Sequence, residues 1–228
     1  MKTIFPLFAF LCCAAGVALP AANAQDISLA ALQEKTSIQC GSLIYGGAQT
    51  SVCFADHFLT RAARDTTLKA ARTFIPVQLG SDAVFNTPFS VWSGEGAFRL
   101  SERERENLRK YLTCGGFIVA SPGCSNAVWD TAFRNELKLA FPNQKLERVP
   151  MTHQIFSTVY QVPRLTLMHG GTAGLLEGLE INGRLVLVYS REGLNDARNA
   201  KGCCCCGGDQ INEGEMINVN LFAYALLF

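Results

Sequence analysis

The chain has 228 residues, of which 49% are hydrophobic and 17% are charged, and its formal net charge at pH 7 is +1. A composition this apolar can supply a full hydrophobic core, and apart from a run of cysteines we see no low-complexity segment or internal repeat. The chain carries no basic stripe and no block of like charge. This charge pattern argues against binding to nucleic acid or to an acidic surface through electrostatic attraction.

The first 24 residues have the three parts of a secretory signal peptide. A short positive start at Lys2 precedes an apolar stretch over residues 4–19, and Ala22-Asn23-Ala24 matches the cleavage site. Cleavage there leaves residues 25–228, which we expect to form one α/β domain. The alternative, an uncleaved anchor, is less favoured because the apolar stretch is short for a spanning helix. The sequence therefore predicts an exported protein, periplasmic or extracellular, with no membrane span after cleavage.

Strands and helices alternate through most of the mature chain. The expected helices lie at residues 27–35, 53–71, 101–114 and 126–141, and the expected strands at 42–45, 74–79, 89–92, 117–120 and 145–149. Pro76 should place its strand at an edge or a bulge of the sheet. Alternation of this kind implies parallel pairing and right-handed crossovers. The predicted fold is a three-layer α/β/α sandwich with a mostly parallel sheet.

The ends of the helix at residues 101–114 are marked by local signals. Ser101 and Glu104 form a capping box, and Gly115-Gly116 should end the helix, with Gly116 at a positive φ. Asn126 or Ser125 should cap the next helix.

The last part of the chain follows another pattern. Two apolar segments, 179–181 and 184–189, flank Asn182-Gly183, which is a strong signal for a β-hairpin. An apolar helix over residues 216–228 should then close the fold. We therefore expect a C-terminal β-hairpin and helix added to the parallel sheet.

Three loops follow strands of the expected parallel sheet and could form a binding site. Ligands of open α/β sheets bind outside the carboxyl ends of the strands, and these loops should meet at that edge. The candidate ligand-binding residues are Gly94, Glu95, Gly96, Ser121, Cys124, Ser125, Asn126, Asn195 and Asp196. The sequence predicts a site for a small ligand or a protein partner here.

Cysteines are the most conspicuous residues of the mature chain. Of the ten cysteines, Cys12 and Cys13 lie in the signal, which leaves eight. An even number in an exported chain favours disulfides, with Cys114 or Cys124 as partners of the run. One alternative is a thiolate site for zinc or copper, although the spacing matches no ordinary zinc module, and the other is a set of free or redox-active thiols. No other cofactor is predicted. The run consists of Cys203, Cys204, Cys205 and Cys206.

A phrase of glycines, aromatic residues and a capping box resembles a known family. The phrase reads Gly94, Gly96, Phe98, Leu100, Ser101, Glu104, Leu108, Tyr111, Leu112, Gly115, Gly116 and Phe117. It resembles a bacterial family of domains of unknown function, number four-one-five-nine. That family is similar in outline to the class I glutamine-amidotransferase-like and flavodoxin-like folds. Many members carry two aspartates where this chain has Ala120-Ser121. An acidic or metal-binding role of those aspartates therefore does not apply to this chain.

The amidotransferase-like resemblance also suggests an enzyme as an alternative. In such folds a nucleophilic cysteine lies on a strand-to-helix turn, where the helix amino terminus lowers a thiol pKa, and Cys124 lies close to that place. A nucleophile needs a base, and His153 is the candidate. The Gly-x-Cys-x-Gly turn is absent, however, since Ser125 and Asn126 follow Cys124. We therefore favour a non-catalytic binding domain, with a cysteine hydrolase using Cys124 and His153 as the alternative.

Overall fold

The computed structural model describes residues 37–170, 173–196, 199 and 208–228. The predicted signal peptide, the expected helix at 27–35 and the cysteine run lie outside these residues. None of the helices in the described part of the chain has both the length and the apolar character needed to cross a membrane.

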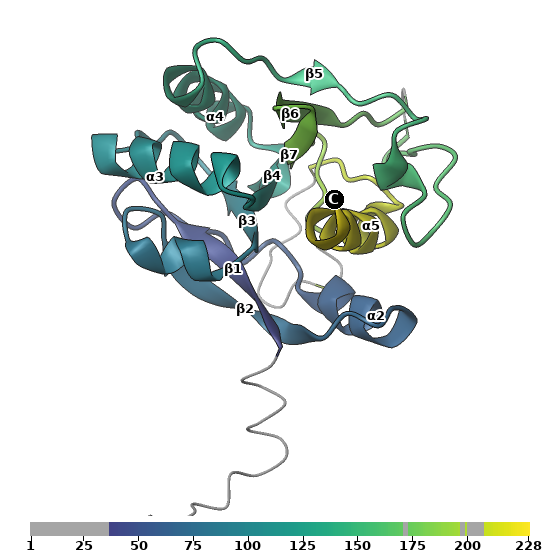
Figure 1. The fold of residues 1–228 in the computed structure, drawn as a ribbon. Helices are drawn as coiled ribbons and strands as arrows, with labels where there is room; N and C mark the ends of the chain where they lie inside the picture. Colours follow the sequence, from purple (N-terminus) through teal and green to yellow (C-terminus); the bar gives the residue numbers. More distant parts are fainter. Residues whose placement is uncertain (1–36, 171–172, 197–198, 200–207) are drawn as a thin grey trace, which may run out of the picture.

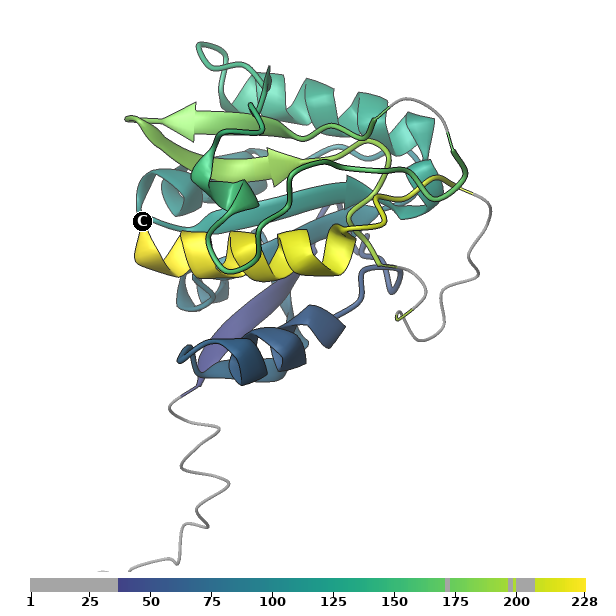
Figure 2. The same ribbon diagram turned by 90° about the vertical axis from the view of Figure 1, so that its right-hand side faces the viewer.

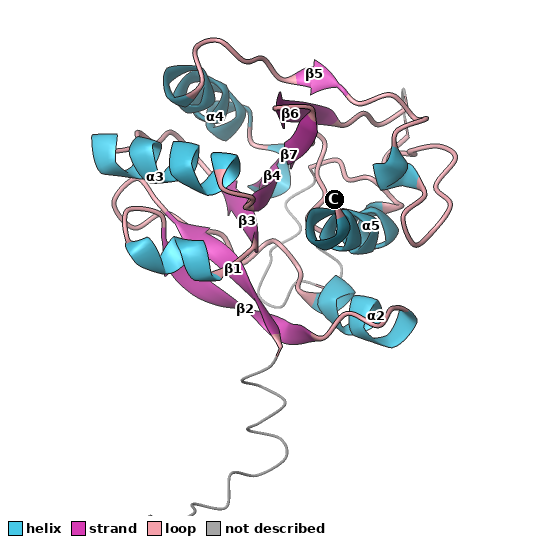
Figure 3. Ribbon diagram, in the orientation of Figure 1, coloured by secondary structure: helices cyan, strands magenta, loops and turns pink. Residues whose placement is uncertain are grey.

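A seven-stranded sheet runs through the middle of the described chain (Figures 1 and 3). Its strands, in spatial order, are β2 (Ala70–Gln78), β1 (Ile38–Ile44), β3 (Phe89–Gly94), β4 (Phe117–Pro122), β7 (Arg184–Tyr189), β6 (Glu177–Ile181) and β5 (Glu147–Arg148). The first five are parallel to one another, whereas β6 and β5 pair antiparallel. The carboxyl ends of β1, β3, β4 and β7 therefore share one edge of the sheet.

Helices cover both faces of this sheet, which confirms the predicted three-layer sandwich (Figures 1 and 2). One face carries α3 (Glu102–Thr113) and α4 (Ala127–Ala140), and the other carries α2 (His57–Asp65) and α5 (Gly214–Leu227). Three short 3₁₀ helices complete the described elements: η1 (Asp82–Asn86), η2 (Gly123–Ser125) and η3 (Gln154–Phe156).

Each face of the sheet has its own hydrophobic core. Side chains alternate between the faces along a strand, so β4 sends Phe117 and Val119 toward α5 and Ile118 and Ala120 toward α4. All four are fully buried. The short, wholly apolar run that predicted a strand covered on both sides thus supplies both cores.

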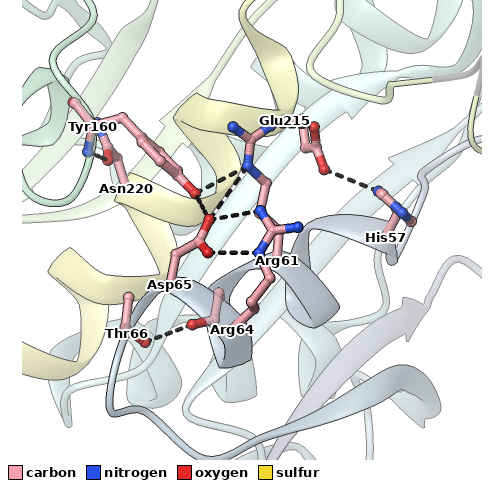
Figure 4. Close-up of polar contacts among 9 residues, drawn as sticks. His57, Arg61, Arg64, Asp65, Thr66, Tyr160, Glu215 and Asn220 are labelled. Carbon is pink, nitrogen blue, oxygen red and sulfur yellow. Dashed lines mark hydrogen bonds and ion pairs between the residues drawn. The ribbon is translucent and has the colours of Figure 1, made fainter.

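A network of polar side chains joins α2 to α5 (Figure 4). Glu215, on the first turn of α5, accepts a hydrogen bond from Arg61 Nη1 at 2.6 Å and pairs with His57 Nδ1 at 2.9 Å. The Tyr160 hydroxyl accepts from Arg61 Nε at 2.9 Å and donates to Asp65. The charged and polar groups of the network thus serve as hydrogen-bond partners for one another. The network therefore fixes the two helices relative to each other.

Several predicted boundaries are confirmed by their local chemistry. Ser101 and Glu104 form the capping box of α3, and the Asn126 side chain caps α4 by accepting from Trp129 N at 2.9 Å. The hairpin turns at Asn182 and Gly183, both at positive φ.

Three predicted elements have other boundaries in the structure. The helix expected from residue 53 begins only at His57, and it ends at Asp65 because Thr66 is extended and its hydroxyl bonds back to Ala62 O at 2.6 Å. The strand that contains Pro76 is correspondingly longer, and it lies at an edge of the sheet as predicted. The strand expected at 145–149 consists of two residues only.

The helix stop after α3 uses its two glycines differently from the prediction. Gly115 takes the positive φ, +104°, and Gly116 does not. A Cβ atom on Gly116 would lie 2.5 Å from the ring of Tyr111. Gly116 is therefore needed for close packing, and Gly115 for the turn.

Candidate functional site

Four segments meet where the parallel strands end. They are residues 45–56 after β1, 95–101 after β3, the turn of η2 after β4, and 190–196 after β7. Their hydrogen bonds to one another hold them together at the carboxyl edge of the sheet. This is the edge that the sequence predicted.

The turn after β4 has an unusual backbone. Cys124 and Ser125 both take positive φ, 50° and 52°, which is uncommon for two successive residues other than glycine. The hydroxyl of Ser125 lies 2.8 Å from Glu192 O and 2.9 Å from Asp209 O. A Cβ atom on Gly208 would lie only 2.4 Å from the Cys124 backbone. The turn is thus held from two sides by segments distant in sequence.

Three of the predicted ligand-binding residues use their side chains to build this edge. Asn126 Oδ1, besides capping α4, accepts from Gly96 N at 3.3 Å and so ties the β3 loop to the turn. Ser121 Oγ accepts from Leu194 N at 3.0 Å. Asn195 donates to Pro122 O at 2.9 Å, and its own carbonyl accepts from Ala55 N at 2.8 Å. The structure therefore brings these three residues together at one edge, where their side chains join neighbouring loops.

Gly94 is also structural, because two aromatic side chains pack against it. The Tyr45 hydroxyl donates to Ser93 O at 3.0 Å and accepts from Trp129 Nε1 at 2.6 Å. A Cβ atom on Gly94 would lie 2.0 Å from that hydroxyl. Burial raises the pKa of Tyr45 well above its usual range, so this phenol remains neutral and acts as a hydrogen-bonding group.

Glu95 and Cys124 meet a third residue, Cys53. One carboxylate oxygen and the two sulfur atoms all lie within 4.8 Å of one another, with Cys53 Sγ and Glu95 Oε1 3.9 Å apart. Cys53 is buried, Cys124 is partly buried and Glu95 is exposed. Gly123 makes room for this arrangement, because a Cβ atom there would lie 2.8 Å from Glu95 Cγ. We call these three residues the Cys–Glu–Cys cluster.

A pocket of about 310 Å³ opens beside the Cys–Glu–Cys cluster. It is lined by Ala48, Gln49, Thr50, Ser51, Val52, Cys53 and Glu95. The lining carries one carboxylate and no basic side chain, so its charge favours a cationic or neutral ligand over an anion. We call it the β1-loop pocket.

Cys53 was not among the predicted site residues. The sequence placed it at the start of a helix, whereas the helix begins four residues later and Cys53 lies in the loop after β1. Its position after a parallel strand, which directs a loop to the carboxyl edge, is the signal that could have identified it.

Two other predicted residues lie at the opposite edge of the sheet. Cys114 caps α3 just before β4, and the six residues of β4 separate that edge from Cys124 by about 20 Å. The ring of His153 packs 5.5 Å from Tyr224, which in turn contacts Phe117 at the start of β4. The pairing of Cys124 with His153 was therefore wrong. Among the described residues no histidine hydrogen-bonds to the Cys124 thiol.

The remaining cysteines differ in accessibility. Cys40, Cys114 and Cys124 carry free thiols in the described part of the chain, so the expected bridges to Cys114 or Cys124 are not seen there. Cys40 is fully buried, and burial raises the pKa of its thiol to about 12. A thiol of that pKa stays protonated at neutral pH and is a poor nucleophile. Two of the predicted site residues, Glu95 and Cys124, meet Cys53 in the Cys–Glu–Cys cluster, and this cluster is where reactive side chains gather at the carboxyl edge of the described chain.

No curated protein matches the chain. The phrase from Gly94 to Phe117, by contrast, predicted a family relationship, and its residues form the end of β3, the whole of α3 and the start of β4. The family model described as Domain of unknown function (DUF4159) matches residues 41–226 and so covers most of the chain. The protein therefore belongs to that family, as the phrase predicted.

Proposed function

We propose that this protein is an exported, non-catalytic binding domain whose small ligand occupies the β1-loop pocket at the carboxyl edge of the sheet. The observation that carries the proposal is the convergence of Glu95, Cys53 and Cys124 from three separate strand ends, with Cys53 and Glu95 lining that pocket. In α/β sheets this edge is where ligands bind.

The size and the chemistry of the pocket support a small ligand over a protein partner. A volume of about 310 Å³ is at the lower end of the range for small-molecule sites, about 300–1,000 Å³. Among the cavities formed by described residues, the groove between α3 and α4 is larger, about 730 Å³. That groove is lined by α3, α4 and residues 97–99 of the loop after β3, and it serves as the control cavity.

The alternative of a cysteine hydrolase loses its main support. A Cys124 nucleophile requires a base within hydrogen-bond reach, and His153 lies at the other edge of the sheet, where its Nδ1 accepts from Ile155 N at 3.2 Å. Burial also lowers the pKa of His153. We therefore do not assign a hydrolytic role.

Native mass spectrometry of the protein from its own compartment tests the proposal. We expect a mass above that of the denatured chain, which reports a retained ligand. Replacing Ala48 by tryptophan, Ala48→Trp, should fill the β1-loop pocket and abolish this excess mass. Val128→Trp, in the groove between α3 and α4, is the matched control and should keep it.

Two results would refute the proposed site. One is an excess mass that Val128→Trp removes and Ala48→Trp leaves unchanged. The other is the absence of any excess mass from protein that is folded and freshly isolated.

Export is a separate part of the proposal and has its own test. If signal peptidase cleaves after Ala24, amino-terminal sequencing of the exported protein should begin at Gln25. The variant Ala24→Asp, which removes the small residue before the cut, should accumulate uncleaved. Exported wild-type protein that begins at Met1 would contradict the proposal.

A further inference from the structure

We infer that the Cys–Glu–Cys cluster is a binding site for a thiophilic divalent metal ion, with zinc as the ion its donors suit best. The inference deepens the proposed function by adding a metal ion beside the β1-loop pocket, and it rests on that function for its location. It assigns Cys53 and Cys124 as thiolate ligands and Glu95 as a carboxylate ligand.

The spacing of the three donor atoms is close to what zinc requires. With Zn–S and Zn–O bonds of about 2.3 and 2.1 Å, ligand atoms of a tetrahedral site lie about 3.5–4 Å apart. Cys53 Sγ and Glu95 Oε1 are 3.9 Å apart, and all three donors lie within 4.8 Å of one another. A small rotation of the side chains is enough to close the site around an ion.

The two thiols are held in place by their backbone. Cys53 N donates to Ser51 Oγ at 3.0 Å, and two residues later Ala55 N donates to the buried Asn195. Cys124 lies on the left-handed turn that Gly208 packs against. Because neither loop needs to reorganise, the thiols are presented to an ion with little loss of conformational entropy.

Glu95 supplies the adjustable part of the site. Its side chain is exposed and lies over Gly123, where any larger residue would collide with it. The carboxylate can therefore move the last few tenths of an ångström toward an ion. Two positioned thiols and one adjustable carboxylate would supply three ligands of a tetrahedral ion.

The donor set selects among metals. Thiolates favour zinc and copper(I), and carboxylates and carbonyl oxygens favour magnesium, calcium and manganese. A carboxylate beside two thiolates suits zinc, which accepts all three donors. Copper(I) would use the two sulfur atoms and leave Glu95 without a role. Each thiol that binds the ion must lose its proton, so affinity should fall as the pH is lowered.

The test is titration of the purified, reduced protein with Zn²⁺ and, separately, with Co²⁺. Bound Co²⁺ reports thiolate ligands through a charge-transfer absorption band. It is done in the wild-type chain and in a background in which Cys203, Cys204, Cys205 and Cys206 are all serine, so that the run contributes nothing. A thiol count and a melting curve for each sample confirm that the cysteines are reduced and the protein folded.

We expect one equivalent of zinc in the serine background, with a cobalt band that reports two thiolates. Cys53→Ser and Cys124→Ser should each weaken zinc binding by about a hundredfold or more, beyond the 10–100-fold that loss of an outer-sphere partner costs. Glu95→Gln should weaken zinc binding and leave the cobalt thiolate band in place. Cys114→Ser, which removes an exposed thiol at the other edge, is the matched control and should change nothing.

Three results would overturn the inference: zinc binding that disappears with the four-serine background, zinc binding that survives Cys53→Ser, and no zinc binding by reduced, folded protein. A Cys53–Cys124 disulfide in protein from its native compartment would also overturn it, because disulfide sulfurs do not ligate zinc. The two proposals can fail independently. A retained organic ligand that Ala48→Trp removes, together with no zinc binding, would refute the metal site and leave the proposed binding domain standing. Zinc binding by the cluster, with no retained ligand that Ala48→Trp removes, would refute the proposed pocket and leave the metal site standing.

Discussion

Replacing Gly94 by alanine should lower the free energy of unfolding by about 3–5 kcal/mol, the combined cost of overpacking and of breaking buried hydrogen bonds. The added Cβ atom would lie 2.0 Å from the hydroxyl of Tyr45 and 2.7 Å from Trp129 Nε1. Both aromatic side chains are fully buried and cannot retreat into solvent. Displacing Tyr45 would also remove the bond to Ser93 O and leave Trp129 Nε1 without its acceptor. Urea unfolding followed by tryptophan fluorescence measures the effect.

Gly96→Ala is the control for this prediction, since Gly96 lies two residues beyond Gly94, in the loop after β3. Its φ is +77° and nothing lies within 4 Å of a Cβ atom placed there. The cost should be limited to backbone strain, about 1–2 kcal/mol. Equal losses for the two variants would show that Gly94 is needed for its conformation and that the packing argument is wrong.

Gly116→Val should have the second largest effect, a loss of about 3 kcal/mol or more, at the upper end of what overpacking costs. The first added carbon would lie 2.5 Å from the Tyr111 ring. The Tyr111 hydroxyl donates to Thr87 O and lies 3.2 Å from Ser90 Oγ, so the ring anchors α3 to the segment that leads into β3. Moving the ring would separate that helix from the sheet. The melting midpoint and the urea midpoint should both fall.

Gly115→Ala separates the two roles of the glycine pair. Gly115 has φ +104° and open space around its Cα atom, so alanine there costs only the strain of an unfavourable backbone, about 1–2 kcal/mol. If Gly115→Ala were the more damaging variant, the helix stop would matter more than the packing of Tyr111.

Much of the fold could be predicted because its signals are local. The capping box of Ser101 and Glu104, the Asn126 cap and the Asn182-Gly183 turn each depend on a few adjacent residues, and each lies where the sequence placed it. The apolar run of β4 likewise reports burial on both faces without reference to its neighbours. The ends of α2 were misplaced because no local signal marks them in the sequence. Apolar residues at helical spacing continue beyond both of the observed caps, Asp56 and Thr66.

The candidate site could be predicted only in part, for the same reason. The loops that follow parallel strands lie at the same edge of the sheet. Glu95, Ser121 and Cys124 could therefore be grouped from the sequence. Which side chains converge within that edge depends on the path of each loop. Cys53 could not be assigned because its loop was taken for helix, and His153 was wrongly assigned because the segment after β5 leads to the other edge.

The left-handed turn at Cys124 and Ser125 has a consequence for how the family can vary. At φ values near 50°, valine, isoleucine and threonine are strongly disfavoured, whereas glycine, asparagine and aspartate are tolerated. Selection for folding alone will therefore restrict these two positions, even in a lineage that has lost its ligand. Cys53 and Glu95 lie on ordinary backbone and carry no such restriction. In a comparison of family members, Cys53 and Glu95 should therefore be present together in proteins that bind the ligand and absent together in proteins that have lost it.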